Sequence, residues 1–328
     1  MSKNLNRRGF LKKSIITPSA ALALSLEERA LLAAKSKSPA ATPESSVKDL
    51  PMGKIGNIKI TRLICGGNLT SGYAHSRDLI YVSSLLRHYF TDEKIFETWQ
   101  ICEDCGINTA ILRLDDQVIR LVNKYWDERG GKLQWIAQVK PKKTDLKNFK
   151  TDIKRAIDNG AVGAYLQGGV GDSLVKKGLV DLLGEAVEFI KENEVIAGIG
   201  AHSIEVPIAC EKAELNPHFY MKTLHQDNYW SATAKEDRTR FALPDHDNMW
   251  CTTGEETIEF MKEVNKPWIA FKVLAAGAIH PRDGFKYAFE NGADFICVGI
   301  FDFQVREDVI IAKDTLSGKM NRQRPWRG

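Results

Sequence analysis

This chain of 328 residues has little cysteine, a small charge excess and, after its N-terminal region, no long apolar run. Six cysteines are too few for a fold held together by disulfides. The one close pair, Cys102 and Cys105, ends an expected helix instead of opening one, which favours buried packing or an incidental disulfide over a redox motif. No apolar run after the N-terminal region is long enough to cross a bilayer.

The formal net charge of +4 comes from the N-terminal region. The first 49 residues hold nine of the 46 Lys and Arg residues but only four of the 42 Asp and Glu residues. The remainder is close to neutral and has no basic stripe, which excludes the electrostatic footprint of a nucleic-acid-binding protein. We therefore expect a small-molecule substrate, no nucleic acid and, after processing, no membrane as partner.

The N-terminal region has the order of segments that marks an export signal. Adjacent arginines, Arg7 and Arg8, precede Phe10-Leu11-Lys12, and an apolar run over 15–26 contains Ala-Leu-Ala at 21–23. This order is typical of a twin-arginine signal peptide. We predict the signal over 1–34, a disordered linker over 35–49 and one domain over 50–328. The twin-arginine export machinery is then a partner, and the location is periplasmic or otherwise exported.

Short β-branched runs alternate with amphipathic segments throughout the expected domain. Helical patterns cover 146–159, 179–192, 255–264 and 284–290, and Gly106, Gly160 and Gly292 stand near helix ends. Eight such units predict an α/β fold of the (β/α)8 TIM-barrel type, as a single domain. A doubly wound sheet is the alternative, but Gly66-Gly67-Asn68 lacks its glycine fingerprint. The strands are expected at 58–66, 107–113, 133–140, 162–167, 195–202, 219–225, 268–274 and 295–300.

Two irregular segments, 67–89 and 226–254, follow expected strands and so belong at the C-terminal mouth of the barrel, where barrel enzymes keep their active sites. The second follows the sixth strand and combines aromatic with polar residues, which suits a lid over a polar ring-shaped ligand. A packed surface loop is the alternative. Its aromatic residues are Tyr229, Trp230, Phe241 and Trp250.

Polar residues stand at the C-terminal ends of most expected strands, and a common ligand can reach them only there. The catalytic candidates among them are histidines that can move protons and lysines that can hold a developing oxyanion. The full set is Asn68, Arg113 with Asp115, Lys140, Gln167, His202, Lys222, His225 with Asp227, and Lys272; the catalytic candidates are Lys140, His202, Lys222, His225 and Lys272.

Histidines and carboxylates around the sixth strand also suggest a metal. The candidate ligands are His202, His225, Asp227 and His246, a nitrogen and oxygen set that suits Zn, Mn or Fe. Such a metal could polarise a sugar hydroxyl or carbonyl. In the alternative, the histidines are acid/base or hydrogen-bonding residues and Asp245-His246-Asp247 is a turn.

The lysines and glycines at the mouth allow two further roles. Mutual repulsion among Lys140, Lys222 and Lys272 would lower their pKa values, so that one of them could form an imine with a carbonyl group. Lys222 ends the sixth strand, the position of the imine lysine in class I aldolases that resemble this fold. The alternative is that the lysines bind a carboxylate or phosphate. Small residues after the last two strands, including Gly277 and Gly299, permit close backbone approach to a phosphate or cofactor.

Three segments are similar to parts of the aldo-keto reductase superfamily. Residues 52–57 with 60–63 resemble its opening hairpin and first strand, 105–108 the end of its first helix, and 270–277 its seventh strand. Over residues 52 to about 316 the chain therefore resembles that family. The resemblance implies a TIM-barrel scaffold, NADP as cofactor and a catalytic tetrad of Asp, Tyr, Lys and His.

Position by position, the tetrad is degenerate. Its Asp, Tyr, Lys and His fall on Ile111, Asp116, Lys140 and Gly168, so one of the four remains. Without the proton donor, the usual route to carbonyl reduction is lost. The sequence thus favours an exported isomerase or lyase of acid/base or metal-assisted type, acting on a carbohydrate derivative. The alternatives are an oxidoreductase with tightly bound NADP, in which His202 or His225 replaces the donor, and a non-catalytic binding barrel.

Overall fold

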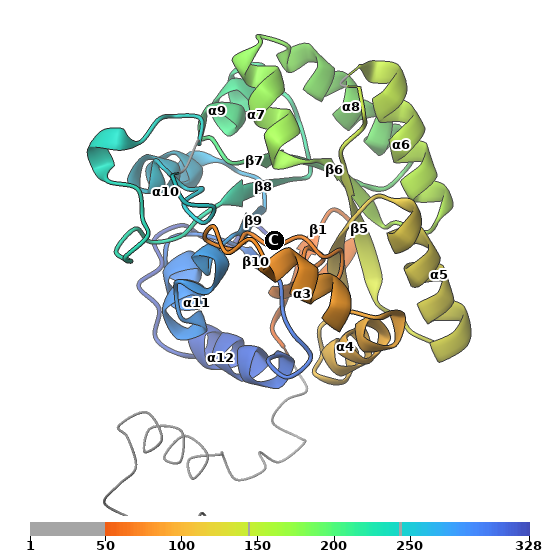
Figure 1. Cartoon of the computed structure of the whole chain (residues 1–328). Coiled ribbons are helices and arrows are strands. Elements are labelled where there is room, and N and C mark those ends of the chain that lie inside the picture. The colour runs from red at the N-terminus through yellow and green to blue at the C-terminus, as the bar shows by residue number, and fades with distance from the viewer. Residues whose placement is uncertain (1–49, 144, 243–244) are drawn as a thin grey trace, which may run out of the picture. The chain divides into compact units, whose positions relative to one another are not determined.

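The computed structural model describes residues 50–143, 145–242 and 245–328. The predicted signal peptide and linker lie outside the described residues. Eight parallel strands close into a barrel in the order β10-β3-β4-β5-β6-β7-β8-β9, seen end-on in Figure 1. The predicted (β/α)8 barrel is therefore confirmed. Its strands are β3 (Leu63–Gly66), β4 (Thr109–Arg113), β5 (Gln134–Val139), β6 (Gly163–Leu166), β7 (Ile196–Ala201), β8 (Phe219–Thr223), β9 (Trp268–Phe271) and β10 (Phe295–Val298).

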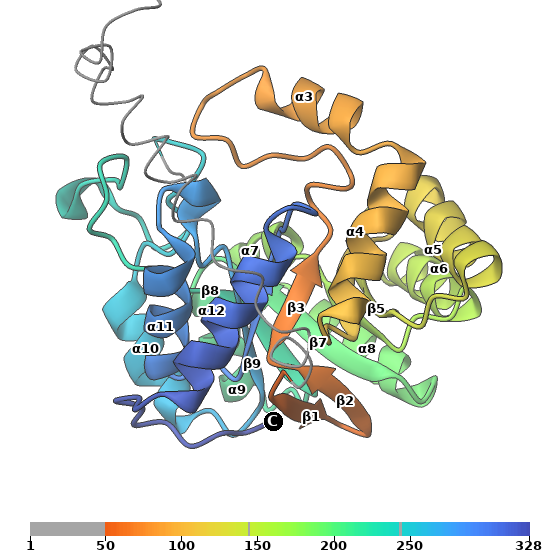
Figure 2. The same ribbon diagram turned by 90° about the horizontal axis from the view of Figure 1, so that it is seen from below.

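Each expected strand range contains one barrel strand, but the first range holds two elements. Its first half, β2 (Ile58–Thr61), pairs antiparallel with β1 (Met52–Ile55), and only β3 enters the barrel. Arg62 separates the two strands, and its backbone N–H donates to the carbonyl oxygen of Pro51. Figure 2 places this hairpin at the end of the barrel where the strands begin, opposite α3 (Val82–Tyr89).

Ten α-helices lie within the described ranges, and most of them surround the barrel. The four helical segments expected from sequence are confirmed to within three residues at each end, as α6, α8, α10 and α11. The helices besides α3 are α4 (Asp92–Asp104), α5 (Asp116–Arg129), α6 (Leu146–Asp158), α7 (Gly168–Lys176), α8 (Val180–Glu192), α9 (Glu205–Lys212), α10 (Gly254–Glu263), α11 (Pro281–Glu290) and α12 (Val305–Ser317).

Local sequence explains where several helices begin and end. Thr91, Asp115 and Asp145 cap α4, α5 and α6, each accepting a hydrogen bond from a backbone N–H of the first turn. At the other ends, Gly106 and Gly160 have φ of 89° and 77°, values that favour glycine. Capping therefore places the strand-to-helix turns, and with them the side chains at the barrel mouth.

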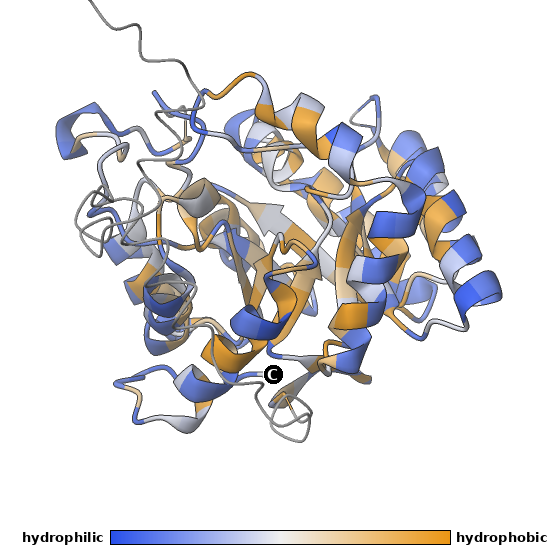
Figure 3. Cartoon of the chain, turned by 60° about the horizontal axis from the view of Figure 1, so that its bottom comes forward, coloured by the Kyte–Doolittle hydropathy of each residue, from blue (hydrophilic) through white to orange (hydrophobic). Residues whose placement is uncertain are grey.

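The core has two layers, as expected for a barrel ringed by helices. Figure 3 shows apolar strands at the centre and helices that are polar on their outer faces. Side chains that alternate along the strands fill either the barrel interior or the layer between barrel and helices. The interior cluster includes Ile64, Ile111, Ile136, Tyr165, Ile196, Phe219, Met221, Ile269 and Phe295.

All six cysteines are buried and free, including Cys102 and Cys105. Buried packing, one of the two expectations for this pair, is thus confirmed over a disulfide. No helix in the described part of the chain is both long and apolar enough to span a membrane.

Candidate active site

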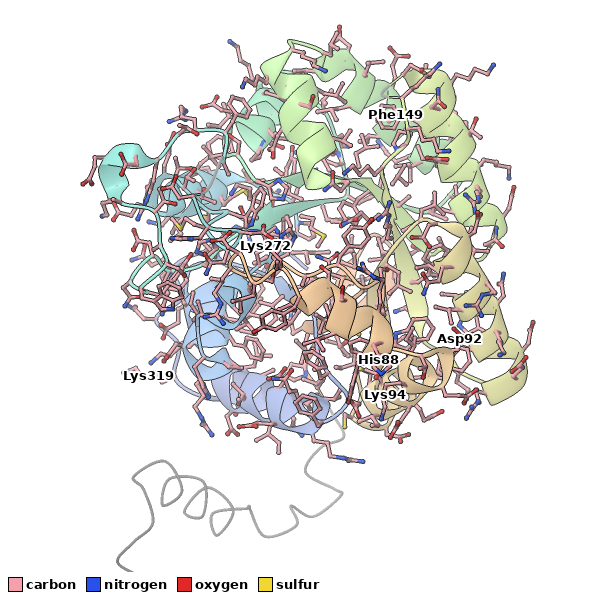
Figure 4. All side chains as sticks on the ribbon, in the orientation of Figure 1. His88, Asp92, Lys94, Phe149, Lys272 and Lys319 are labelled. Carbon is pink, nitrogen blue, oxygen red and sulfur yellow. The ribbon has the colours of Figure 1, made fainter. Side chains whose placement is uncertain are left out.

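The candidate site lies at the C-terminal mouth of the barrel, beyond the ends of β7, β8 and β9. His202 directly follows β7, Lys272 directly follows β9, and Trp250 comes from the long segment after β8. In Figure 4 the labelled Lys272 lies near the barrel axis, whereas Asp92, Lys94 and Lys319 lie at the periphery.

His202 is held by a carboxylate from the preceding βα unit. Its Nδ1 lies 2.7 Å from Asp172 Oδ2, and the same carboxylate accepts the backbone N–H groups of His202 and Ser203. An imidazole oriented this way donates from Nδ1 and leaves the lone pair of Nε2 for a substrate. Burial lowers the pKa of His202, and Asp172 partly opposes that shift. The ring is thus neutral near pH 7 and suited to accept a proton.

Glycines explain how Asp172 comes so close to His202. A Cβ on Gly171 would lie 2.3 Å from the carbonyl oxygen of Gly200, and a Cβ on Gly200 would lie 2.6 Å from that of Leu166. Only glycine permits this approach of α7 to β7. A Cβ on Gly168 would likewise lie 2.9 Å from Cε1 of His202. The His202 ring therefore fills the space beside Gly168.

Trp250 forms the central wall of the site. The centre of its ring lies 4.9 Å from that of His202 and 5.4 Å from that of His75. Two partly buried hydrogen bonds hold its backbone, since its N–H donates to His225 Nε2 and its carbonyl accepts from Thr223 Oγ1. The indole Nε1 is buried and has no hydrogen-bond partner among the described residues.

A second histidine–carboxylate pair lies on the same indole. His75, from the segment after β3, places Nδ1 2.9 Å from Asp247 Oδ1, from the segment after β8. Burial lowers the pKa of His75, an effect that Asp247 opposes and Lys272 reinforces. Burial alone would raise the pKa of Asp247, but His75 and Lys272 together lower it. Asp247 is therefore the carboxylate that faces both His75 and Lys272.

Lys272 carries an amine without a partner. Its Nζ has no exposed surface and no hydrogen bond to any residue that the structure describes, and it lies 4.4 Å from the centre of the Trp250 ring. Burial lowers the pKa of Lys272 to about 7, although Asp247 opposes the shift. Buried polar groups are normally paired in folded proteins. Two buried donors of contacting side chains, Lys272 Nζ and Trp250 Nε1, are thus unpaired and suit a ligand that carries oxygen acceptors.

The structure separates the other predicted catalytic residues from this centre. Lys222 shares a strand face with Tyr220, which packs in the barrel–helix layer, and its Nζ donates to Thr223 instead of entering the barrel interior. Strand alternation therefore turns Lys222 toward the helix layer, an orientation that does not favour its predicted catalytic role. Lys140 follows β5 and is exposed at the rim.

His225 is also engaged elsewhere. Its Nδ1 donates to the carbonyl of Gln226, and its Nε2 accepts the N–H groups of Trp250 and Cys251. Burial lowers the pKa of His225 to about 4, so the ring is neutral. With both nitrogens bonded to backbone, His225 fixes the position of Trp250 and has no lone pair left for proton transfer.

The predicted metal set is not brought together. His202 pairs with Asp172 and His225 with backbone, while Asp227 binds Arg238 at 2.7 Å and His246 pairs with Asp78. Across residues 50–143, 145–242 and 245–328, no group of three or more His, Cys, Asp or Glu side chains is arranged to hold a metal ion. The candidate ligands His202, His225, Asp227 and His246 therefore have other partners.

Gly277 and Gly299, the predicted cofactor glycines, are both exposed. Gly277 has a φ of 77° with open space around it, and a Cβ on Gly299 would lie 3.1 Å from Leu69. Their cofactor role stays a prediction, as does the lid role of the segment after β8. That segment does contribute Asp247 and Trp250 to the site.

Sequence reasoning missed His75, Asp172 and Asp247 as partners in the site. His75 and Asp247 lie in the two irregular segments expected at the mouth, so their position in the sequence could have identified them as candidate site residues. Asp172 lies one turn inside α7, and from sequence a carboxylate at such a position is expected on the solvent-exposed face of the helix. Only the close α7–β7 contact brings it to His202.

Neither the protein-family models nor the curated protein sequences match this chain. Solved structures do. A Pseudomonas aeruginosa protein provisionally designated an aldo-keto reductase is 13% identical with a TM-score of 0.58, and the match covers 84% of this chain and 100% of that one. The aldo-keto reductase AKR11C1 of Bacillus halodurans is 13% identical with a TM-score of 0.52, covering 83% and 92%.

A variant of Gox0644 in complex with NADPH is 9% identical with a TM-score of 0.54, covering 83% of this chain and 90% of that one. At these identities the likeness establishes the fold, which agrees with the barrel scaffold expected from the sequence. The chemistry has to be argued from the site itself.

Proposed function

We propose that this protein is an enzyme that moves a proton at a carbon next to a carbonyl group, in an isomerase or lyase type of reaction. A small polar carbohydrate derivative is the substrate class. One observation carries the proposal: His202, oriented by Asp172, and the amine of Lys272, which has no hydrogen-bond partner among the described residues, both lie against the Trp250 ring.

In this proposal His202 is the general base. Its Nε2 takes the proton from carbon, and Asp172 stabilises the imidazolium that forms, as a carboxylate on the far nitrogen does in other histidine bases. Lys272 and Trp250 Nε1 receive the carbonyl end of the substrate, where negative charge develops. His225 positions the indole through its two backbone hydrogen bonds.

The residues present do not fit the alternative of a bound NADP. At the end of β10, where the family resemblance places the cofactor phosphate, Asp302 holds Lys94 in an ion pair of 3.1 Å. The first turn of α12 then carries Glu307, followed by a buried Asp308 whose pKa burial raises to about 7. Carboxylates at a helix N-terminus occupy the positive end of its dipole and repel a phosphate. We therefore derive no step through NADP.

Solvent exchange is the direct test of proton abstraction. The purified protein is incubated in D2O with aldoses, ketoses and their carboxylated derivatives, from trioses to hexoses, and NMR follows deuterium entering the carbon next to the carbonyl. We expect exchange with at least one sugar class, lost in His202→Gln and kept in His88→Gln, which alters an exposed histidine of α3. Absence of exchange with every substrate would overturn the proposal; NADPH oxidation would then favour a reductase, and binding alone a non-catalytic barrel.

Export is a separate proposal that rests on Arg7 and Arg8. A chain carried by the twin-arginine machinery would act in the periplasm or another exported location. Cell fractionation of the full chain tests this against a variant with Arg7→Lys and Arg8→Lys. We expect the variant to stay in the cytoplasm, and equal distribution of the two chains would contradict the proposal.

A further inference from the structure

We propose that Lys272 captures the carbonyl group covalently, forming an imine with a small aldehyde or ketone. This inference rests on the proposed function and deepens it, because it narrows the substrate class to free carbonyl compounds. It places the imine at Lys272 instead of Lys222, the position that the sequence allowed for an imine.

The surroundings of Lys272 favour a nucleophilic amine. Aromatic rings lie near its Nζ, with the ring centre of Trp250 at 4.4 Å and that of Phe271 at 6.0 Å, and no described residue accepts a hydrogen bond from it. An ammonium group loses hydration there without gaining a hydrogen-bond acceptor. Desolvation therefore favours the neutral amine, although the face of Trp250 attracts a cation, and the lowered pKa of about 7 agrees with burial as the larger effect. A desolvated lysine of this kind is a known route to an activated nucleophile.

The backbone holds the amine in place. Lys272 has a φ of 59°, a left-handed conformation that is costly for a residue with a Cβ, and its carbonyl accepts the N–H of Ala275. Ala275 and Ala276 have φ of 44° and 54° in the same turn. Such conformations persist only where the surrounding structure enforces them, and they cluster at functional sites. Buried Asn248 supports this turn by donating to the carbonyl of Ala275.

The chemistry balances without a further reactant. The lone pair of Lys272 Nζ forms a bond to the carbonyl carbon, the carbonyl π electrons move to oxygen, and oxygen gains the proton that nitrogen loses. Protonation of the resulting hydroxyl lets it leave as water while nitrogen forms the C=N bond. His202 and His75, whose rings contact the same indole, can carry these protons. The protonated imine then draws electrons from the adjacent C–H bond that His202 attacks.

Reductive trapping tests this step. The purified protein is treated with glycolaldehyde or dihydroxyacetone and sodium borohydride, and peptide mass mapping locates the reduced adduct. We expect labelling of Lys272 at least about tenfold above that of exposed lysines. The adduct should disappear from the active-site peptide in Lys272→Arg and in Lys272→Met, and remain in Lys142→Arg, which alters an exposed lysine without a proposed role.

The outcomes separate this inference from the proposed function. Labelling spread over lysines in proportion to exposure, or labelling at Lys222, would overturn the imine at Lys272. Solvent exchange without any trapped adduct would leave proton transfer in place and likewise overturn the imine. If the unaltered protein shows neither solvent exchange nor a trapped adduct, both proposals are refuted.

Discussion

The two ends of the barrel differ in whether their buried charged side chains have partners. At the N-terminal end, Asp294 is fully buried, and both of its carboxylate oxygens accept hydrogen bonds, including those of Arg322 and Arg324. At the C-terminal mouth, Lys272 Nζ and Trp250 Nε1 are buried without a partner among the described residues. At the closed end the buried charges of Asp294, Arg322 and Arg324 are paired, although Arg322 Nε has no hydrogen-bond partner; at the mouth the whole amine of Lys272 has none among the described residues.

Arg324 shows how complete the closure is. Its guanidinium donates to Asp294 and to the carbonyls of Met261, Val264, Lys266 and Gly292. These bonds tie the C-terminal segment across the beginning of the barrel, next to the hairpin seen in Figure 2. Barrels typically separate stability at this face from function at the opposite one. The comparison predicts that mutations at the two ends change different measurements.

The largest expected effect is on stability, at the closed end. Replacing Asp294 with Ala leaves Arg324, which has no exposed surface, without its counter-charge. Breaking a buried ion pair this way costs about 3–5 kcal/mol in the free energy of unfolding. Urea unfolding of Asp294→Ala against the unaltered protein measures it, with Asp302→Ala, at the rim, as a control expected to lose far less. A loss in Asp294→Ala no larger than in that control would contradict the assignment of the closed end to stability.

The next effect is on activity, at the open end. Replacing His202 with Gln keeps a polar side chain but removes the base, and general base catalysis contributes about 10²-fold or more to the rate. Asp172→Asn should reduce solvent exchange less, because it alters only the orientation and charge of the imidazole. Both variants should unfold near the midpoint of the unaltered protein. A His202→Gln variant that keeps its exchange rate would remove His202 from the mechanism.

A third prediction concerns how much the burial of Lys272 lowers the free energy of unfolding. Burial lowers the pKa of Lys272 to about 7 in the folded chain, against 10.5 in the unfolded one. The unfolded state therefore binds more protons between these values, so this lysine costs most stability at and below neutral pH and least above pH 10.5. Lys272→Met should raise the free energy of unfolding at pH 7 by on the order of 2 kcal/mol, with the gain shrinking as pH rises. Lys140→Met is the matched control, and an equal or pH-independent change in both would contradict the cause.

Sequence could predict the barrel but only part of the site, for a physical reason. Strands and helices follow local periodicity, so all eight barrel strands were expected at the right places. Side-chain direction depends on strand alternation to within one residue, so the expected strand alone did not show that Lys222 turns toward the helix layer. The partners of His225 and His202, which are the backbone of Trp250 and the carboxylate of Asp172, come from segments whose approach no local pattern encodes.

The smallest expected effect lies at Gly168, the first residue of α7 at the barrel mouth. A Cβ there would meet Cε1 of His202 at 2.9 Å, and Asp172 and Trp250 prevent the ring from yielding easily. Gly168→Ala should therefore slow solvent exchange about tenfold by displacing the base. Stability should change little, because alanine in a helix offsets part of the strain by roughly 0.5–1 kcal/mol.

Gly169→Ala is the matched control, since its Cβ would meet only the side chain of Gln167, at 3.2 Å. Exchange rates and urea midpoints of the two variants decide the point. Equal exchange rates would mean that the His202 ring has room to move, and that α7 does not fix the base as the Asp172 contact indicates. A slowed Gly168→Ala with an unchanged midpoint would show that close packing at the mouth serves activity, whereas close packing around Asp294 serves stability.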